Sequence, residues 1–321
     1  MKTINSNSDL GCYGLGSSAP SNAKGAGIMK KSKSIMLAAA TAVASLLGAA
    51  AMPANASVIN LSNGDSSLSI NPASNAGVDN WTVDGTNQLN KEWFWFRVGS
   101  SGPQSSIDSL TLTSQTALST NGGSNNWANV TYADIAQAFQ LSVTFQLSGG
   151  QAHSGTADLA ETIQITNTGT SNLSYHFFDY TSMALAGHSG GQNVSLTGLN
   201  TATQSTTGGT SQTVVSAPAA EDEAGLGTGS SFPLLSALET TSGLTLSGST
   251  TGTDVNGEWA FEWDPILKPG QSYLITVDKQ ICTVPEPTSS LALLGMGGIF
   301  ISRPRRRDED PDPRTMQVAE A

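Results

Sequence analysis

The chain has 321 residues, of which 38% are hydrophobic and only 12% are charged, and its net charge is −11. This acidic balance argues against nucleic-acid binding and against attraction to an anionic membrane surface, because both need a basic surface. The charge is unevenly spread. Residues 57–283 hold 18 acidic side chains against four basic ones, so most of the lysines and arginines lie near the two ends of the chain.

The first 28 residues are rich in Gly, Ser and Asn and show no hydrophobic periodicity. We therefore expect either a disordered leader or a start codon placed too early. Met29 is the better start, because three lysines follow it within four residues and an Ala-rich apolar run extends over residues 35–52.

An Ala-x-Ala pattern, Ala54 to Ala56, ends this apolar run. A basic segment, an apolar segment and small residues at a cleavage site are the layout of a secretory signal peptide. The pattern predicts that residues 29–56 direct export through the Sec pathway. Signal peptidase is expected to cut after Ala56, which leaves Ser57 as the first mature residue. The alternative is an N-terminal membrane anchor.

Residues 57–283 form the body of the protein, and their hydrophobic residues alternate with polar ones, which indicates half-buried strands. Residues 139–147 are the clearest case. Residues 159–166 and 172–181, joined by a Gly-containing loop, predict a β-hairpin. Lys268-Pro269-Gly270-Gln271 predicts a type II turn. Residues 201–229, rich in Thr, Gly and Ala, are interpreted as a long loop interrupted by one strand.

Many short strands separated by turns predict an all-β fold, an antiparallel β-sandwich of roughly 10–14 strands. Residues 258–264 fit this fold, because Trp259, Phe261 and Trp263 fall on one face of a strand and acidic residues fall on the other. The body is long enough for one large β domain or two smaller ones.

The body contains no recognisable catalytic motif, phosphate loop or calcium loop. Its histidines are His153, His176 and His188, and no spacing among them suggests a metal site. His176 lies three residues from Asp179, which in a strand places the two side chains on opposite faces. We therefore expect no cofactor, no metal ion and no catalytic residue, and a protein that is not an enzyme.

One acidic residue breaks the alternation, since Glu161 shares its phase with the apolar Leu159 and Ile163. Either it points inward or it marks a strand edge or bulge. A buried carboxyl group has a raised pKa and is typical of functional sites. A glycosidase needs a second, facing carboxylate, which the sequence does not indicate. A secreted hydrolase is therefore the weaker alternative.

The densest aromatic patch is residues 91–97, in which Trp93 and Trp95 share one face. Apolar residues on both faces are typical of a central strand buried on both sides. Tryptophans on an open face would instead stack on sugar rings. Trp127, in an Asn-rich segment, is a further candidate for contact with a glycan.

Residues 284–307 combine three features. Pro285 and Pro287 hold the backbone around Glu286 extended, because proline fixes φ and restricts the residue before it. The uncharged residues 288–302 follow. As a helix they span roughly 22 Å, which is shorter than the helix of ~20 residues that crosses a bilayer comfortably. Bilayer thinning or snorkelling of the arginines would allow a short transmembrane helix. The alternative is a helix packed on the body.

A basic cluster, Arg303, Arg305, Arg306 and Arg307, ends the segment and is expected on the cytoplasmic side of the membrane. The order of Pro-Glu-Pro, apolar helix and arginines resembles the PEP-CTERM sorting signal of bacterial exported proteins. The resemblance implies recognition by an exosortase, a membrane-embedded cysteine transpeptidase, with cleavage at or near Pro285-Glu286-Pro287. Residues 308–321 would then form an acidic cytoplasmic tail.

These features together predict a protein that is transiently anchored in the membrane and then delivered to the cell surface or extracellular matrix. We expect its body to have a structural or adhesive role. The alternative is a carbohydrate-binding module that acts on envelope or matrix polysaccharide, an association that the resemblance also implies.

Overall fold

The computed structural model describes residues 56–136, 138–225, 231–246 and 250–283. The chain divides into two units, Met1–Val284 and Pro285–Ala321, and every described residue lies in the first. Except for Ala56, the predicted signal peptide lies outside the described residues, and so do the predicted transmembrane helix and arginine cluster. Within the described residues, no helix combines the length and the apolar character that crossing a membrane would require.

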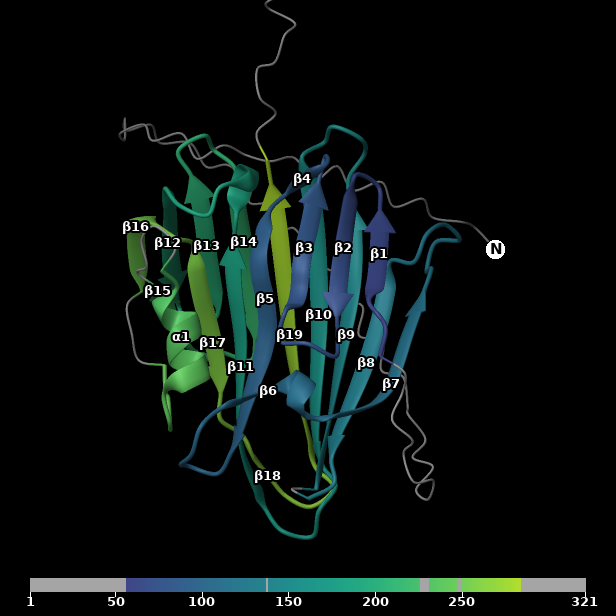
Figure 1. Ribbon diagram of the computed structural model, residues 1–321, viewed down its shortest axis with the longest axis vertical. Coiled ribbons are helices and arrows are strands. Elements are labelled where there is room, and N and C mark those ends of the chain that lie inside the picture. The colour runs from purple at the N-terminus through teal and green to yellow at the C-terminus, as the bar shows by residue number, and fades with distance from the viewer. Residues whose placement is uncertain (1–55, 137, 226–230, 247–249, 284–321) are drawn as a thin grey trace, which may run out of the picture. The chain divides into compact units, whose positions relative to one another are not determined.

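The body consists of two large β-sheets (Figure 1). The first sheet has the order β1-β2-β3-β5-β11-β17-β15, with β4, β6 and β18 paired to β3, β5 and β11. Its strands are β1 (Ile59–Asn63), β2 (Ser66–Asn71), β3 (Gly77–Val83), β4 (Thr86–Asn87), β5 (Leu89–Val98), β6 (Ser105–Ser106), β11 (Leu173–Met183), β15 (Glu221–Gly225), β17 (Glu258–Trp263) and β18 (Ile266–Leu267).

The second sheet has the order β16-β12-β13-β14-β19-β10-β9-β8-β7. Its strands are β7 (Thr111–Leu118), β8 (Trp127–Asp134), β9 (Phe139–Gly149), β10 (Thr156–Asn167), β12 (Gln192–Thr197), β13 (Thr201–Thr206), β14 (Ser211–Ala217), β16 (Thr251–Val255) and β19 (Ser272–Cys282). The described residues also form the 3₁₀ turns η1 (Ile107–Ser109) and η2 (Leu185–Gly187) and the helix α1 (Pro233–Thr240).

The predicted all-β antiparallel sandwich is confirmed, because the strands pair antiparallel except at β3 and β5, which run parallel. The described residues contain 19 strands, more than expected. Part of the excess comes from residues 201–229, where the structure forms β13, β14 and β15 instead of a loop with one strand. Thr and Ser pair well in these strands, although their low hydrophobicity hides the alternation.

Aromatic side chains from the inner faces of both sheets build the core. Phe94 of β5 lies 6.2 Å from Phe145 of β9, measured between ring centroids, and Phe96 lies 5.4 Å from Phe139. Phe139 also meets Tyr175 of β11 edge to face at 5.0 Å. Because these pairs join strands of different sheets, they identify the inner faces, and the residues between them along β5 and β11 point outward.

Part of the outer face of the first sheet, along β5, β11 and β17, is also covered, by α1 and the segment that follows it. Glu258 of β17 accepts hydrogen bonds from the backbone N–H groups of Leu234 (3.1 Å) and Leu235 (3.3 Å) in the first turn of α1, where an anion is stabilised. Tyr180 of β11 donates to the same carboxylate at 2.9 Å. All six residues of β17 are therefore buried, although alternate ones face opposite sides of the sheet.

The sequence correctly predicts single strands and turns with a regular pattern, but it predicts the pairing of two strands wrongly. β9 alternates as predicted, with its odd positions buried. Gln271 donates its N–H to the Lys268 carbonyl at 2.9 Å and Gly270 has φ +74°, which confirms the type II turn. The predicted hairpin of residues 159–181 is wrong: β10 pairs with β9 and β19, while β11 belongs to the other sheet.

Candidate functional site

A group of ionisable side chains converges where β5, β11 and β17 lie side by side. Phe177 of β11 is paired with Trp263 of β17, so the residues next to this pair, His176 and Glu262, share the outer face. His176 Nδ1 lies 3.3 Å from Glu262 Oε1 and 2.5 Å from Asp264 Oδ1, just after β17. One imidazole nitrogen thus faces two carboxyl groups.

Arg97 of β5 completes the group from the opposite side, since it is paired with His176 across β5 and β11. Its Nη2 lies 3.9 Å from Glu262 Oε1, and its Nη1 donates to the carbonyl of Leu244 at 2.6 Å. The guanidinium also lies over the ring of Phe178, 5.8 Å from the ring centroid. Arg97 is therefore held in one orientation by three different elements.

Burial makes Glu262 the unusual acid of this group. The loss of solvation raises the pKa of Glu262 to about 8, and the charge of Asp264 adds to this shift. Two groups oppose it: the N–H of Leu246, which donates to Oε2 at 2.7 Å, and the charge of Arg97. This pKa favours the protonated form of Glu262 at neutral pH, and the carboxyl group lies beside the imidazole of His176. Such a pair is suited to general acid–base chemistry.

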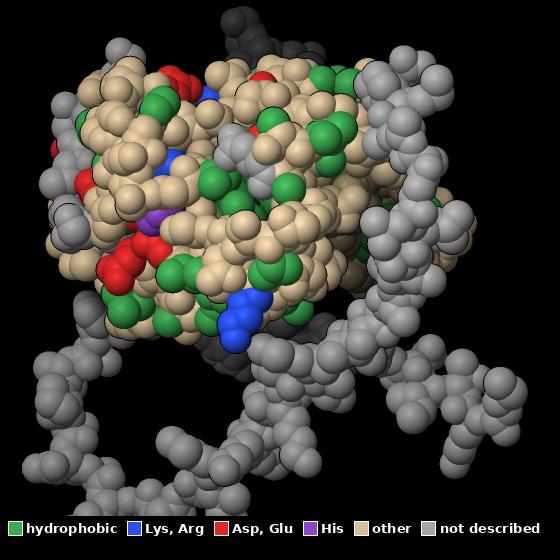
Figure 2. All heavy atoms as spheres, turned by 90° about the horizontal axis from the view of Figure 1, so that it is seen from below, with side chains coloured by type: hydrophobic (Ala, Val, Ile, Leu, Met, Phe, Trp, Pro, Cys, Tyr) green, Lys and Arg blue, Asp and Glu red, His purple; other side chains and the backbone are tan. Residues whose placement is uncertain are grey.

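The group opens to solvent at one end. The side chain of Asp264 is 40% exposed and that of His176 is 13% exposed, whereas Arg97 and Glu262 are buried. Figure 2 views the body from the end where β18 lies and shows a histidine beside acidic side chains, on a face that is mostly backbone and side chains that are neither charged nor hydrophobic. We call Arg97, His176, Glu262 and Asp264 the His176 cluster.

Three members of the His176 cluster could also ligate a metal ion. One ligand atom each from His176, Glu262 and Asp264 lies within 4.8 Å of the others. A nitrogen and two carboxylate oxygens are donors that suit several divalent cations. The nearby guanidinium of Arg97 already balances part of the negative charge, so the hydrogen-bonded arrangement needs no metal ion to account for it.

The tryptophans predicted as glycan contacts lie elsewhere. Trp93 and Trp95 are buried, Trp93 donating its indole N–H to Asp108 of η1 at 3.2 Å and Trp95 packing edge to face on Tyr180. Neither ring face is open to solvent, so the structure shows the alternative that we considered, a strand buried on both sides. Trp127 is half-buried at the start of β8.

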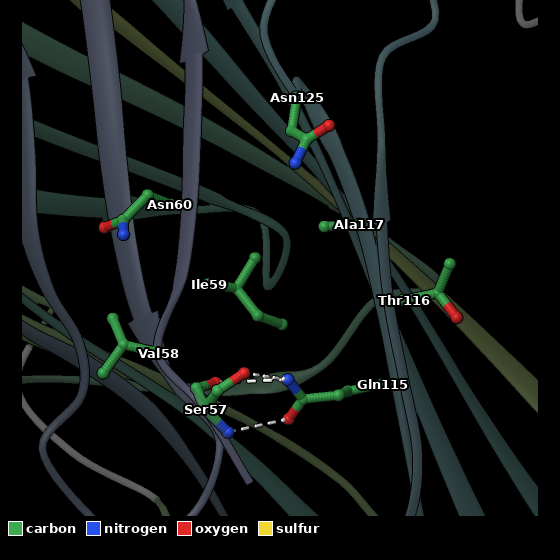
Figure 3. A pocket seen from close by; sticks show the side chains of 8 residues that line it. All are labelled: Ser57, Val58, Ile59, Asn60, Gln115, Thr116, Ala117 and Asn125. Carbon is green, nitrogen blue, oxygen red and sulfur yellow. Dashed lines mark hydrogen bonds between the residues drawn. The ribbon is translucent and has the colours of Figure 1, made fainter. Parts of the chain in front are cut away.

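The expected processing residues lie mostly outside the described residues, namely Ala54, Pro285, Glu286, Pro287 and the arginines of 303–307. Ala56 and Ser57 are described, and both are exposed. Ser57 lies in a shallow cavity of about 340 Å³ together with Asn60, Gln115 and Asn125 (Figure 3). The Gln115 amide accepts from the backbone N–H of Ser57 at 3.2 Å and donates to its hydroxyl at 2.6 Å.

Glu161 does point into the protein, which sequence reasoning had left open. It is buried between the sheets and lies 2.9 Å from the ammonium group of Lys279. The His176 cluster, by contrast, was missed. Glu262 lies 86 residues from His176 in the sequence, and only the register between β11 and β17 brings them together. The acidic face of residues 258–264 was the one available signal.

Residues 283–307 match the family model described as the PEP-CTERM protein-sorting motif. The predicted resemblance is thereby confirmed for this segment. The motif indicates an exported protein that is sorted to the cell envelope or surface and processed by an exosortase. A search of curated proteins found no match for the chain.

Several solved structures resemble the body. A candidate aldose 1-epimerase from Escherichia coli K12 is 11% identical, and the match covers 72% of this chain and 100% of that one with a TM-score of 0.43. A galactose mutarotase-like protein from Lactobacillus casei is 9% identical, with coverage of 70% and 100% and a TM-score of 0.41. A bacterial glucoamylase complexed with acarbose is 7% identical, with coverage of 76% and 36% and a TM-score of 0.48.

The expectation that this protein is not an enzyme is corrected by these comparisons. The similar structures are described as an epimerase, a mutarotase-like protein and a glucoamylase, so a non-enzymatic role does not follow from the missing sequence motifs. Those motifs are local in sequence, whereas the His176 cluster is assembled from three strands that are distant in sequence. The His176 cluster is therefore the group of residues at which catalytic activity has to be tested.

Proposed function

We propose that the body of this exported protein binds a carbohydrate of the envelope or matrix at the His176 cluster. The observation that carries the proposal is the convergence of an arginine, a histidine and two acids on the outer face of the first sheet, where two of the four side chains reach solvent. Sugars present neighbouring hydroxyl groups, and planar charged side chains with fixed orientation bind them through paired hydrogen bonds. Asp264 and His176 are exposed enough to reach such hydroxyls.

We place this binding activity in the following course of events. The signal peptide directs Sec export, and signal peptidase cuts after Ala56. The C-terminal helix anchors the chain transiently in the membrane until the exosortase acts near Pro285-Glu286-Pro287. The processed body then resides at the surface or in the matrix, where extracellular polysaccharide is the partner. Because the body is acidic, an uncharged polysaccharide fits as its partner better than a negatively charged one.

A second candidate is acid–base catalysis on the bound sugar. The raised pKa of Glu262 keeps a proton on a buried carboxyl group 3.3 Å from His176 Nδ1, directly behind the partly exposed imidazole that a bound sugar could contact. Glycosidic hydrolysis is less well supported. Its two carboxyl groups face each other across the substrate, whereas Glu262 and Asp264 lie next to each other at the end of one strand.

Binding is tested with the exported protein and the polysaccharide extracted from its own host, by titration calorimetry. His176→Ala and Asp264→Asn should each weaken binding by about 10- to 100-fold, as expected for the loss of a charged hydrogen bond. His188→Ala is the matched control, because His188 is exposed and lies outside the cluster. Equal affinities for all the variants would contradict the proposed site. Release of a new reducing end, or a change in optical rotation of a monosaccharide, would support catalysis.

A further inference from the structure

A second group of charged side chains lies sealed between the two sheets. Glu92 of β5 and Asp179 of β11 point inward from the first sheet, whereas Glu161 of β10 and Lys279 of β19 point inward from the second. All four side chains are buried. Lys279 Nζ lies 2.8 Å from Glu92 Oε1, 2.9 Å from Glu161 Oε2 and 3.3 Å from Asp179 Oδ1. The ring of Trp259 lies beside the ammonium group, with its centroid 5.7 Å from Nζ.

The charges of this group do not balance, since three carboxyl groups surround one ammonium group. Three of their oxygens accept no hydrogen bond from any residue that the structure describes: Glu92 Oε2, Glu161 Oε1 and Asp179 Oδ2. A buried charge without full pairing costs several kcal/mol, so some of these carboxyl groups hold protons instead. The proton distribution is therefore a property of the whole group.

The direction of each shift agrees with this view. Burial raises the pKa of Glu161 well above its usual range, and the neighbouring charge of Glu92 raises it further. Burial also raises the pKa of Asp179, to about 6. Burial alone would lower the pKa of Lys279, but the three carboxylates outweigh it and raise that pKa. An ammonium group, an ionised carboxyl group and protonated acids are thus held together where water has no direct access.

We propose that Lys279 and Asp179 become joined by an intramolecular isopeptide bond. The reactive pair is the neutral amine and the neutral carboxylic acid, which form when the ammonium group passes a proton to the carboxyl cluster. The Nζ lone pair attacks Asp179 Cγ, the new C–N bond forms, and one C–O bond of the carboxyl group breaks. The departing hydroxyl group takes one proton from Glu161 and leaves as water, and the nitrogen, which keeps one hydrogen in the amide, gives its surplus proton back to Glu161. No oxidant or other co-reactant is needed.

The arrangement favours Asp179 as the acceptor. Asp179 has the shortest side chain of the three acids, with the fewest rotatable bonds, and lies on a central strand; its Oδ1 accepts a hydrogen bond from Nζ at 3.3 Å, as Glu161 Oε2 does at 2.9 Å. The charge of Glu92 adds to the effect of burial in raising the pKa of Glu161, which suits Glu161 to act as the acid that polarises the Asp179 carbonyl. Strands of both sheets hold the groups in contact, so the reaction is effectively unimolecular and the loss of charge removes the cost of burial.

The bond would connect two strands that belong to different sheets. β19 is the last strand before the sorting motif of residues 283–307, and β11 lies in the middle of the first sheet. The two bonded residues are separated by 100 positions, so the covalent link closes a long loop of the chain. A pull on the processed C-terminus would then be resisted by a covalent bond between the sheets as well as by the hydrogen bonds of β19.

Mass spectrometry of the denatured protein, produced from its full sequence, tests this inference. The linked chain should be lighter than the sequence mass by one water molecule. Proteolysis should then release a branched peptide that contains both Lys279 and Asp179. Fragment mapping is essential, because cyclisation at Asp84-Gly85 would lose the same mass. Recovery of an unbranched Lys279 peptide from the wild-type protein would overturn the proposal, and so would a branch from Lys279 to Glu92 or Glu161.

Variants separate the roles of the four side chains. Lys279→Met and Asp179→Ala should each abolish the branched peptide. Glu161→Gln should reduce its yield at least tenfold while both bonded residues remain. Lys268→Met is the control, because Lys268 is exposed and its loss should leave the yield unchanged. The wild-type result decides the matter even if a core variant does not fold, because the measurement is made on denatured chains.

Discussion

Replacing Glu262 with Gln should change how the stability of the protein depends on pH. Gln has nearly the shape of Glu, and its amide oxygen can still accept the 2.7 Å hydrogen bond from Leu246. It carries no charge and does not titrate. The variant therefore isolates the contribution that the protonation of one buried acid makes to folding.

The sign follows from the direction of the pKa shift. The pKa of Glu262 is raised from 4.5 to about 8 by burial, so between these values the folded state holds a proton that the unfolded state has released. The free energy of unfolding from this group is fully present below about pH 4.5 and is lost as pH rises toward 8. The full shift corresponds to about 5 kcal/mol; because the cluster opens to solvent, we expect on the order of 2–4 kcal/mol.

Urea unfolding of both proteins at a series of pH values measures this effect. The wild-type protein should lose about 2–4 kcal/mol relative to Glu262→Gln between about pH 5 and pH 9. Other buried acids contribute equally to both proteins and cancel in the difference. Glu239→Gln is the control, because the Glu239 side chain is exposed on the surface of α1, and it should show no such pH dependence. A constant difference between wild type and Glu262→Gln, or one that favours the wild type at high pH, would refute the reasoning.

Three further substitutions test the packing around the two charged groups. Glu258→Ala removes the acceptor at the start of α1 and should destabilise the protein by about 2–4 kcal/mol and speed hydrogen exchange in α1, whereas unchanged exchange would contradict this role of Glu258. Lys279→Met removes the nitrogen that three buried acids surround and should cost about 3–5 kcal/mol in thermal or urea unfolding, far more than Lys268→Met; equal costs would argue against the buried group. Gly77→Ala should cost on the order of 1–3 kcal/mol, because Gly77 has φ +61° and a Cβ there would lie 2.4 Å from the ring of Trp93; a neutral substitution would show that β3 can shift.

The sequence correctly predicts the elements that depend only on residues close together in the chain. The alternation in β9, the turn at Lys268 to Gln271 and the two faces of residues 258–264 each follow from a few consecutive residues. The sorting motif is local as well, since three features stand in order within 25 residues.

The rest depends on pairing between distant strands. The regular patterns of β10 and β11 suggested a hairpin, but the loop between them crosses from one sheet to the other. His176 and Glu262 carried no local signal, because each is one polar residue in a strand and only the register of β11 against β17 joins them. Glu161 was noticed because it broke a pattern, yet its partner Lys279 lies 118 residues away.

The central claim is that this protein is exported and then sorted through its C-terminal motif. The most direct measurement is the intact mass and location of the protein in its own host, compared with a variant in which Pro285 and Pro287 are both Ala. The account predicts an extracellular or surface form that begins at Ser57 and ends near Pro285, and the loss of this form in the variant. A full-length C-terminus retained in the membrane fraction by both proteins would contradict it.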